Sequence, residues 1–230
     1  MQISEISKRY GKKQVLNRIS FRAEKGKCIG VIGANGCGKS TLFRILAGIE
    51  KADAGTIYLD GREIVFGKAN LSGYIGYVPQ ENALLEELSV KDNIDLFAAL
   101  GKESKDKKFR EQLCKQFSIN SFQKEKVSRL SGGMKKRVSI VCALINRPKI
   151  LIMDEPSAAL DLVFKKELKS FIEVFTGEGG TVLLSSHDKG EIENCDELYA
   201  IQDGEITVVD KNMTVEAMTT KYMQKKNQEG

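Results

Sequence analysis

The chain has 230 residues, of which 36 are Lys or Arg and 31 are Asp or Glu, and its net charge is +5. This length allows a hydrophobic core that needs no disulfides, and the small net charge favours a mixed, solvated surface over a nucleic-acid-binding patch. The five cysteines are scattered and show no C-x-x-C spacing, which is typical of reduced thiols in the cytosol. Because neither a signal peptide nor an apolar run of about 18 residues is found, we expect a soluble domain without membrane spans.

The first elements are expected to be strands. In residues 1–27, Ile19, Phe21 and Ala23 alternate with polar neighbours, which indicates β structure with one buried face. Residues 28–32 form a short apolar run, as in a strand that is buried on both faces.

A phosphate-binding pattern, G-x-x-x-x-G-K-[ST], follows that strand and is met by Gly33, Ala34, Asn35, Gly36, Cys37, Gly38, Lys39, Ser40 and Thr41. Glycines let the backbone turn its amides inward, and the helix that follows offers its positive end. Lys39 supplies an ammonium for phosphate oxygens, and Ser40 is a candidate ligand of Mg²⁺. We expect this environment to lower the pKa of Cys37 and favour its thiolate; the alternative is a small residue that merely fits the loop.

The middle of the chain changes from strand to helix. Turn residues on both sides of residues 56–59 indicate a short strand in a small antiparallel sheet, and residues 75–78 form another strand, which ends at Pro79-Gln80. Helical spacing dominates from residue 82 to residue 147. Its apolar stripes are Val90, Ile94, Phe97 and Leu100; Phe109, Leu113 and Phe117; and, after Ser131, Val138, Val141, Cys142 and Ile145.

The last third returns to alternating strands and helices. Residues 150–153 are a continuous apolar strand that ends at Asp154-Glu155, and ligands of open α/β sheets bind at that edge. An amphipathic helix from Phe164 to Phe175 is followed by a strand over residues 181–185 and by His187. Asp203-Gly204 joins two final strands, and residues 214–224 are expected to form a closing helix.

Seven motifs in order resemble those of the nucleotide-binding subunit of the ATP-binding cassette family, across essentially the whole chain. They are Tyr10; residues 33–41; Gln80; Leu130-Ser131-Gly132-Gly133; residues 150–155; Ser157-Ala158-Ala159-Leu160-Asp161; and His187. The resemblance implies an α/β P-loop NTPase with a RecA-like parallel core sheet, a small N-terminal antiparallel β subdomain and an inserted α-helical subdomain. In a single domain spanning 1–230, the core with its β subdomain takes residues 1–81 and 148–230, and the helical subdomain takes residues 82–147.

The resemblance also implies a role for each motif. Tyr10 would stack on adenine, although a core tyrosine is the alternative. Lys39 and the loop amides would bind phosphates of ATP, while Ser40 and Asp154 would hold Mg²⁺ and Gln80 would contact Mg²⁺ or the attacking water. The catalytic residues would be Lys39, Gln80, Glu155 and His187, with Glu155 polarising the attacking water and His187 contacting the γ-phosphate. The alternatives are an ordinary loop amide at Gln80 and a surface acid at Glu155.

Ser131, Gly132 and Gly133 stand at a predicted helix N-terminus and form a second anion site. In the family such a segment closes over ATP held by a second cassette, so we expect a head-to-tail dimer with Leu160 and Asp161 along the seam. Met134 stands where the family usually has glutamine, and Ala159 where glycine is common. Neither change removes a phosphate-binding amide.

The function implied is the ATP-hydrolysing subunit of a transporter, at the cytoplasmic face of the cell membrane. Its partners would be a separate transmembrane permease, docked near Gln80 and residues 84–90, and a second cassette in a homodimer or heterodimer. No nucleic-acid partner is expected. The alternatives are a non-transport cassette that acts on ribosomes or DNA, and a regulatory cassette that binds ATP without turnover.

Overall fold

The computed structural model describes residues 1–64, 71, 73–101, 106–157 and 160–223. Its elements, in chain order, are β1 (Gln2–Tyr10), β2 (Lys13–Arg22), β3 (Cys28–Ile32), α1 (Lys39–Leu46), β4 (Ala54–Leu59), β5 (Arg62–Glu63), β6 (Ile75–Val78), α2 (Val90–Ala99), α3 (Lys107–Gln116), α4 (Gly132–Leu144), β7 (Ile150–Asp154), α5 (Leu162–Gly177), β8 (Thr181–Ser185), α6 (Lys189–Asn194), β9 (Glu197–Gln202), β10 (Glu205–Val208) and α7 (Val215–Met218).

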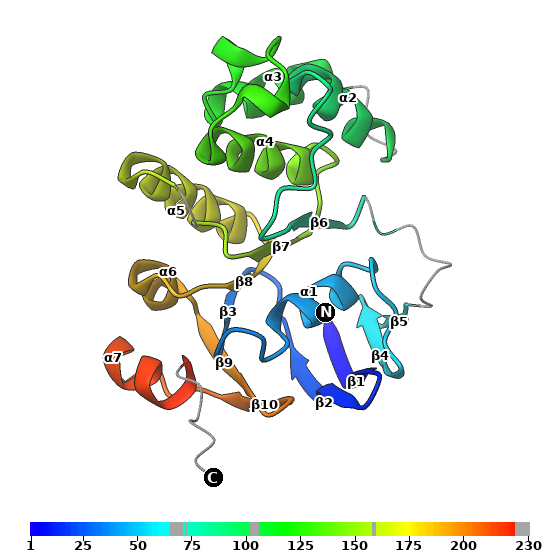
Figure 1. Cartoon of the computed structure of the whole chain (residues 1–230), viewed down its shortest axis with the longest axis vertical. Coiled ribbons are helices and arrows are strands. Elements are labelled where there is room, and N and C mark those ends of the chain that lie inside the picture. Colours follow the sequence, from blue (N-terminus) through cyan, green and yellow to red (C-terminus); the bar gives the residue numbers. More distant parts are fainter. Residues whose placement is uncertain (65–70, 72, 102–105, 158–159, 224–230) are drawn as a thin grey trace.

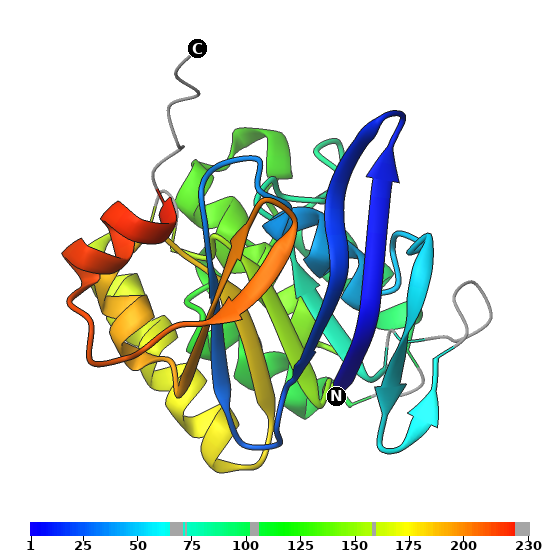
Figure 2. The same ribbon diagram turned by 90° about the horizontal axis from the view of Figure 1, so that it is seen from below.

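Two sheets organise these elements. One has the strand order β10-β9-β3-β8-β7-β6, in which β9, β3, β8, β7 and β6 are parallel and β10 pairs antiparallel with β9. The other is antiparallel, with the order β2-β1-β4-β5. In Figure 1 the helices α2, α3 and α4 form a lobe above the sheets, and Figure 2 shows the long β1 and β2 beside the core sheet.

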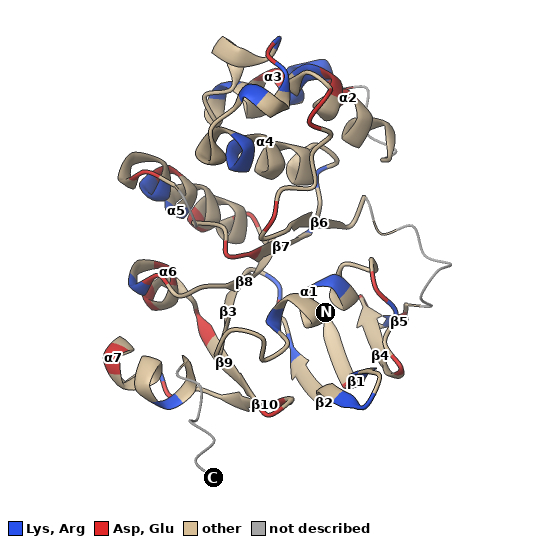
Figure 3. Ribbon diagram, viewed as in Figure 1, with Lys and Arg blue, Asp and Glu red and all other residues tan. Residues whose placement is uncertain are grey.

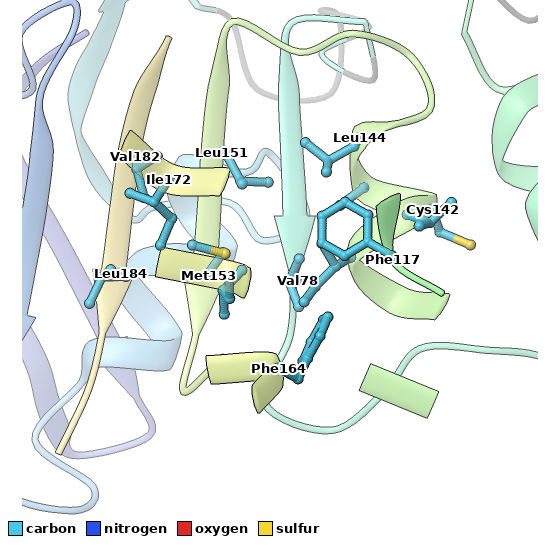
Figure 4. Close-up of a cluster of buried hydrophobic side chains, with 14 of the residues drawn as sticks. Val78, Phe117, Cys142, Leu144, Leu151, Met153, Phe164, Ile172, Val182 and Leu184 are labelled. Atoms are coloured by element: carbon cyan, nitrogen blue, oxygen red, sulfur yellow. The ribbon is translucent and has the colours of Figure 1, made fainter. Parts of the chain in front are cut away.

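The core sheet is buried on both faces. In β7, Leu151 and Met153 belong to a cluster with side chains of α4 and α5, whereas Ile150 and Ile152 belong to a second cluster with α1 and the antiparallel sheet. The first cluster is drawn in Figure 4, where Phe164 and its neighbours face the strands. Burial on both faces explains why β3, β7 and β8 are apolar without alternation.

Helix α4 is buried more completely than its sequence indicates. Besides the predicted stripe, Ile140, Ala143 and Leu144 are buried, because α4 packs between α2 and β6. The approach to β6 is close: a Cβ at Gly76 would lie 2.4 Å from the carbonyl oxygen of Ala143. A glycine is therefore required in β6 for this packing.

The predicted elements agree with the structure over most of the chain. The strand over residues 75–78, the strand over residues 181–185 and the turn at Asp203-Gly204 are confirmed. The prediction is wrong for one residue of the first apolar stripe. Leu100 is 56% exposed, because α2 ends at Ala99 and Leu100 lies just past its last turn.

The closing helix predicted over residues 214–224 is confirmed from Val215 to Met223, although its second part is a π-helix. Helix α7 has four residues and continues as a π-helix, Thr219–Met223. Gln224 and the tail of residues 225–230 lie outside the described residues.

The described helices contain no segment that is both long and apolar enough to cross a membrane. Figure 3 shows basic and acidic residues on the same helices, for example α5 and α6.

Candidate active site

The loop of residues 33–41 connects the buried strand β3 to helix α1. Gly33 and Gly38 have φ values of 152° and 117°. A Cβ at Gly33 would lie 2.6 Å from the carbonyl oxygen of Ile201, and a Cβ at Gly38 would lie 2.9 Å from a methyl group of Leu16. Glycine is therefore required at both positions, and the loop turns tightly into the positive N-terminal end of α1.

Lys39 is the first residue of α1 and is only 6% exposed. Its Nζ donates to the carbonyl oxygens of Gly33 at 2.8 Å and of Ala34 at 3.4 Å. Among the described residues no carboxylate forms an ion pair with it, so this buried ammonium has carbonyl partners alone. A buried cation beside a loop of amides fits an anionic ligand, such as the phosphates of a nucleotide.

One cavity brings the three predicted metal ligands together. It has a volume of about 780 Å³, and Ser40, Gln80 and Asp154 are among its lining residues. Tyr77 also lines it; burial and the negative charge of Asp154 raise the pKa of Tyr77 to about 12. The described residues contain no cluster of three His, Cys, Asp or Glu side chains that could hold a metal. One carboxylate and one hydroxyl suit Mg²⁺, which is commonly held by few protein ligands together with phosphate.

Asp154 and Glu155 are positioned by the end of β8. Asp154 is 1% exposed and accepts a hydrogen bond of 2.6 Å from the hydroxyl of Ser185. The amide of Glu155 donates to the same hydroxyl oxygen at 3.0 Å and to the carbonyl oxygen of Ser185 at 3.2 Å. Glu155 has a φ of 50°, an uncommon conformation for a residue with a side chain. Ser185 therefore fixes both acidic residues.

His187 lies beside Glu155, as expected from its place after β8. Its Nε2 is 3.2 Å from Oε1 of Glu155, and the imidazole is more exposed than the carboxylate, with side-chain exposures of 38% and 17%. The pair is therefore open on the histidine side. A carboxylate held by an imidazole can accept a proton from water.

Tyr10 ends β1 and is 45% exposed. Its hydroxyl donates to the carboxylate of Glu50 and accepts from Nη2 of Arg44 at 3.4 Å. Arg44 Nη2 also reaches the hydroxyl of Thr41, at 3.4 Å. The hydroxyl end of the tyrosine is thus tied to α1, and the ring is left partly exposed.

The second predicted anion site lies in a different cavity. Ser131 caps α4 by accepting a hydrogen bond of 3.3 Å from the amide of Met134, and Ser131 and Gly132 are exposed. Ser131, Gly132 and Gly133 line a cavity of about 470 Å³ that shares no residue with the cavity of Ser40. The structure therefore does not bring the two anion sites of one chain together.

The predicted seam residue Asp161 borders that second cavity. It caps α5 by accepting from the amide of Phe164 at 2.8 Å and pairs with Arg137 at 3.3 Å. Leu160 is partly buried against the core. Ala158 and Ala159 lie outside the described residues. Met134 also packs against the core, which gives an apolar side chain at this position a packing partner.

The expected thiolate at Cys37 is wrong. Burial raises the pKa of Cys37, and the attraction of Lys39 offsets this only in part. The physical reason is packing: Cys37 is half-buried and lies against Gly33 and the core cluster behind the loop. A raised pKa favours the neutral thiol. None of the five cysteines, all of which are described, is in a disulfide.

Two buried polar residues at the site were missed by the sequence reasoning. Ser185 is the hydroxyl that ends the otherwise aliphatic strand β8, a change in residue type that was visible in the sequence. Lys136 is 2% exposed, and its ammonium donates to the carbonyl oxygens of Pro79 and Gln80, both at 2.9 Å. Its spacing from Ile140 and Ala143, four and seven residues on, indicates the buried face of α4.

A third missed residue is Glu191 in α6. Its carboxylate accepts hydrogen bonds from the hydroxyls of Ser186 and Ser157. Ser186 directly precedes His187, and Ser157 lies in the segment that follows Glu155. Burial, assisted by the charge of Asp188, raises the pKa of Glu191 to about 7. No sequence pattern indicates this burial, because α6 has six residues and Ile192 is its only large apolar side chain.

Known proteins resemble this chain over nearly all its length. Residues 16–158 match the family described as ABC transporter. The lantibiotic transport ATP-binding protein SrtF of Streptococcus pyogenes is 36% identical over 90% of this chain and 88% of the relative. The probable sulfate/thiosulfate import ATP-binding protein CysA of Chlorella vulgaris is 37% identical over 89% of this chain and 88% of the relative.

Solved structures agree on the fold. An ATP-binding subunit of an ABC transporter superposes with a TM-score of 0.85 at 24% identity, covering 95% of this chain and 97% of that chain. A dimeric cassette in a post-hydrolysis state, bound to ADP and Pi, has a TM-score of 0.82 at 23% identity and covers 92% of this chain and 99% of its own. The expected α/β P-loop NTPase fold is confirmed. The chain therefore belongs to the ABC transporter family, in which it is an ATP-binding subunit with ATPase activity.

Proposed function

We propose that two copies of this chain, or this chain and a related cassette, close head to tail around two ATP molecules and transmit the cycle to a membrane permease. The observation that carries this proposal is the separation of the two anion sites. Ser40, which follows Lys39 in the phosphate loop, lines one cavity, while Ser131 to Gly133 line another, although both sites are suited to phosphate. A head-to-tail pair completes each site with the other chain's segment, and two-fold symmetry then generates two such sites.

In the proposed complex, the loop amides and Lys39 bind the β- and γ-phosphates of ATP. Lys39 reaches them by exchanging its bonds to Gly33 and Ala34 for charge-assisted bonds to phosphate oxygens. Tyr10 stacks on the adenine with its exposed ring. Ser40, Asp154 and Gln80 hold Mg²⁺, which when bound neutralises charge on the phosphates.

Hydrolysis uses the acidic pair at the end of β7. A water molecule attacks the γ-phosphorus, the bond to the ADP oxygen breaks, and Glu155 accepts the proton of the water. His187, at 3.2 Å from Glu155, orients that carboxylate and donates to the γ-phosphate. Ser185 keeps Glu155 in position throughout, because it holds the backbone of this residue rather than its carboxylate.

We assign permease docking to the groove between the proposed helical subdomain, residues 82–147, and the nucleotide-binding core. The groove is the cavity of Gln80, and its rim carries the apolar residues Ile49 and Leu100, which are 62% and 56% exposed. In the docking segment expected from the sequence, Leu84 and Val90 are buried but Leu85 is 51% exposed, so residues near Leu85 are available to a docking surface together with Gln80. Docking there would place the chain at the cytoplasmic face of the membrane.

The deciding experiment is Glu155→Gln. The variant should bind ATP with unchanged affinity and hydrolyse it at least about 100-fold more slowly, because one proton acceptor is removed. With Mg²⁺ and ATP it should accumulate as a dimer in size-exclusion chromatography. Glu173→Gln on the exposed face of α5 is the matched control and should behave as wild type. Undiminished hydrolysis by Glu155→Gln, or a dimer that is absent with ATP, would refute the proposal.

A further inference from the structure

Lys136 is a buried cation for which the proposed cycle has no role. It lies in the second turn of α4, and its ammonium donates hydrogen bonds of 2.9 Å to the carbonyl oxygens of Pro79 and of Gln80. The carboxylates of Asp154 and Glu155 are close enough to favour its charge, while burial lowers its pKa. An ammonium has three donors, and two of them are committed to the backbone that carries Gln80.

The neighbour Lys135 shows that this contact is specific to one side of the helix. Its ammonium pairs with Glu86 at 2.5 Å, and its side chain is 21% exposed. Lys136 instead points to the strand side, where Gly76 allows α4 to approach β6 closely. The two lysines therefore differ in location while they share charge and sequence context.

Helix α4 also carries at its N-terminal end the motif of residues 130–133, here called the signature segment. Ser131 is its cap, Gly132 and Gly133 are its first residues, and Lys136 follows one turn later. A helix is stiff over one turn, because each residue is held by hydrogen bonds along the axis. Movement of the signature segment toward a partner's nucleotide would therefore move the ammonium that holds Gln80.

We propose that Lys136 is a positioning residue for Gln80, which links engagement of the signature segment on one nucleotide to the placement of Gln80 at the other. The inference rests on the proposed function, since it uses the role of Gln80 at the metal or the attacking water. Lys136 is not among the residues that line the cavity of Ser40 and Asp154. It acts through the two carbonyl oxygens that it binds.

The test compares Lys136→Met, which keeps the length of the side chain but has no donor, with Lys136→Gln, which keeps two donors. Steady-state ATPase assays with Mg²⁺ and ATP should show kcat reduced about 10-fold or more in Lys136→Met, with KM for ATP within about threefold of wild type. Lys136→Gln should recover most of kcat. Lys135→Met is the matched control and should remain within about twofold of wild type.

A double-mutant cycle separates positioning from a general loss of structure. If Lys136 acts through Gln80, Lys136→Met should lower kcat in the wild-type background but have little further effect in Gln80→Ala. An equal reduction in both backgrounds, a change confined to KM, or a Lys136→Met variant as active as Lys135→Met would overturn the inference. If Lys136→Met does not fold, a Lys136→Gln variant that folds but fails to hydrolyse ATP would do the same. None of these outcomes changes the result expected for Glu155→Gln, so a failure of this inference can be distinguished from a failure of the proposed function.

Discussion

The two anion-binding halves of the cassette differ in how they are built. The half around the phosphate loop is interior: Lys39 and Asp154 are 6% and 1% exposed, and each is hydrogen-bonded within the chain. The half at the start of α4 is exterior, with Ser131 and Gly132 exposed and little tertiary structure committed to it.

This difference predicts that the stability of the folded chain and its association with a second cassette can be changed independently. Removing a partner from a buried polar group costs about 1–3 kcal/mol, so changes in the interior half should affect both folding and chemistry. Changes in the exterior half should leave the folded monomer intact and affect turnover alone, because that half acts on the nucleotide of another chain. The predictions that follow test this separation, beginning with the largest effect.

Lys39→Ala should strongly weaken phosphate binding by the interior half. We expect ATP affinity to fall by about 100-fold or more, because the charge-assisted bonds to phosphate are lost. We also expect a loss of about 1–3 kcal/mol in the free energy of unfolding, because the carbonyl oxygens of Gly33 and Ala34 lose a donor. Titration calorimetry and urea unfolding measure the two effects. Lys12→Ala, in an exposed turn, is the control; equal ATP affinity in the two variants would contradict the assignment.

Gly132→Asp should affect the exterior half and leave the monomer stable. A carboxylate at the start of α4 interacts favourably with the helix dipole, so the melting temperature should not fall. The same charge repels the partner's phosphates, so turnover should drop about 10- to 100-fold while ATP affinity of the monomer is retained. Gly132→Asn introduces a neutral side chain of nearly the same size as Asp, so its turnover should drop much less. A drop in melting temperature that matched the loss of turnover would break the separation.

Ser185→Ala should weaken the interior half through both of its acidic residues. The variant loses the hydroxyl that binds Asp154 and the amide of Glu155. We expect a loss of about 1–2 kcal/mol in unfolding free energy and a reduction in kcat of about 10-fold. The exposed Ser170→Ala in α5 is the control. Unchanged kcat with reduced stability would show that Ser185 supports the fold without positioning Glu155.

Much of the interior half could be predicted from the sequence because its determinants are local. Residues 33–41 carry their own turn and helix start. Asp154 ends β7 and is followed by Glu155, and His187 comes after β8, a strand that proves to be adjacent and parallel to β7. Parallel strands end at the same edge of a sheet. Strand type and order were therefore sufficient to bring these side chains together.

The errors and omissions depend on contacts between distant parts of the chain. The bond from Lys136 to Pro79 joins residues 57 positions apart, and that from Ser185 to Asp154 joins residues 31 positions apart. The pKa of Cys37 was mispredicted for a similar reason. Its local surroundings favour the thiolate, but packing of the loop against the core removes water from the sulfur.

Glu191→Gln should have the smallest effect, which is a change in how the free energy of unfolding depends on pH. Burial raises the pKa of Glu191 from 4.5 to about 7. A carboxyl group with a raised pKa contributes stability that is fully present below pH 4.5 and is lost as the pH rises through about 7. At 1.36 kcal/mol per pKa unit this contribution is about 3 kcal/mol at most.

Glutamine does not ionise, so Glu191→Gln should lack that loss. The difference in unfolding free energy, variant minus wild type, should therefore rise between pH 5 and pH 8, as measured by urea unfolding at each pH. Other acids with lowered pKa values, such as Asp188, make the unfolding free energy change with pH in the opposite direction. Their contribution is present in both proteins and is removed when the difference is taken. Glu193→Gln on the exposed side of α6 is the control and should give a flat difference. A flat difference for Glu191→Gln as well would mean that water reaches this carboxylate, and that the interior half extends no further than Ser185 and His187.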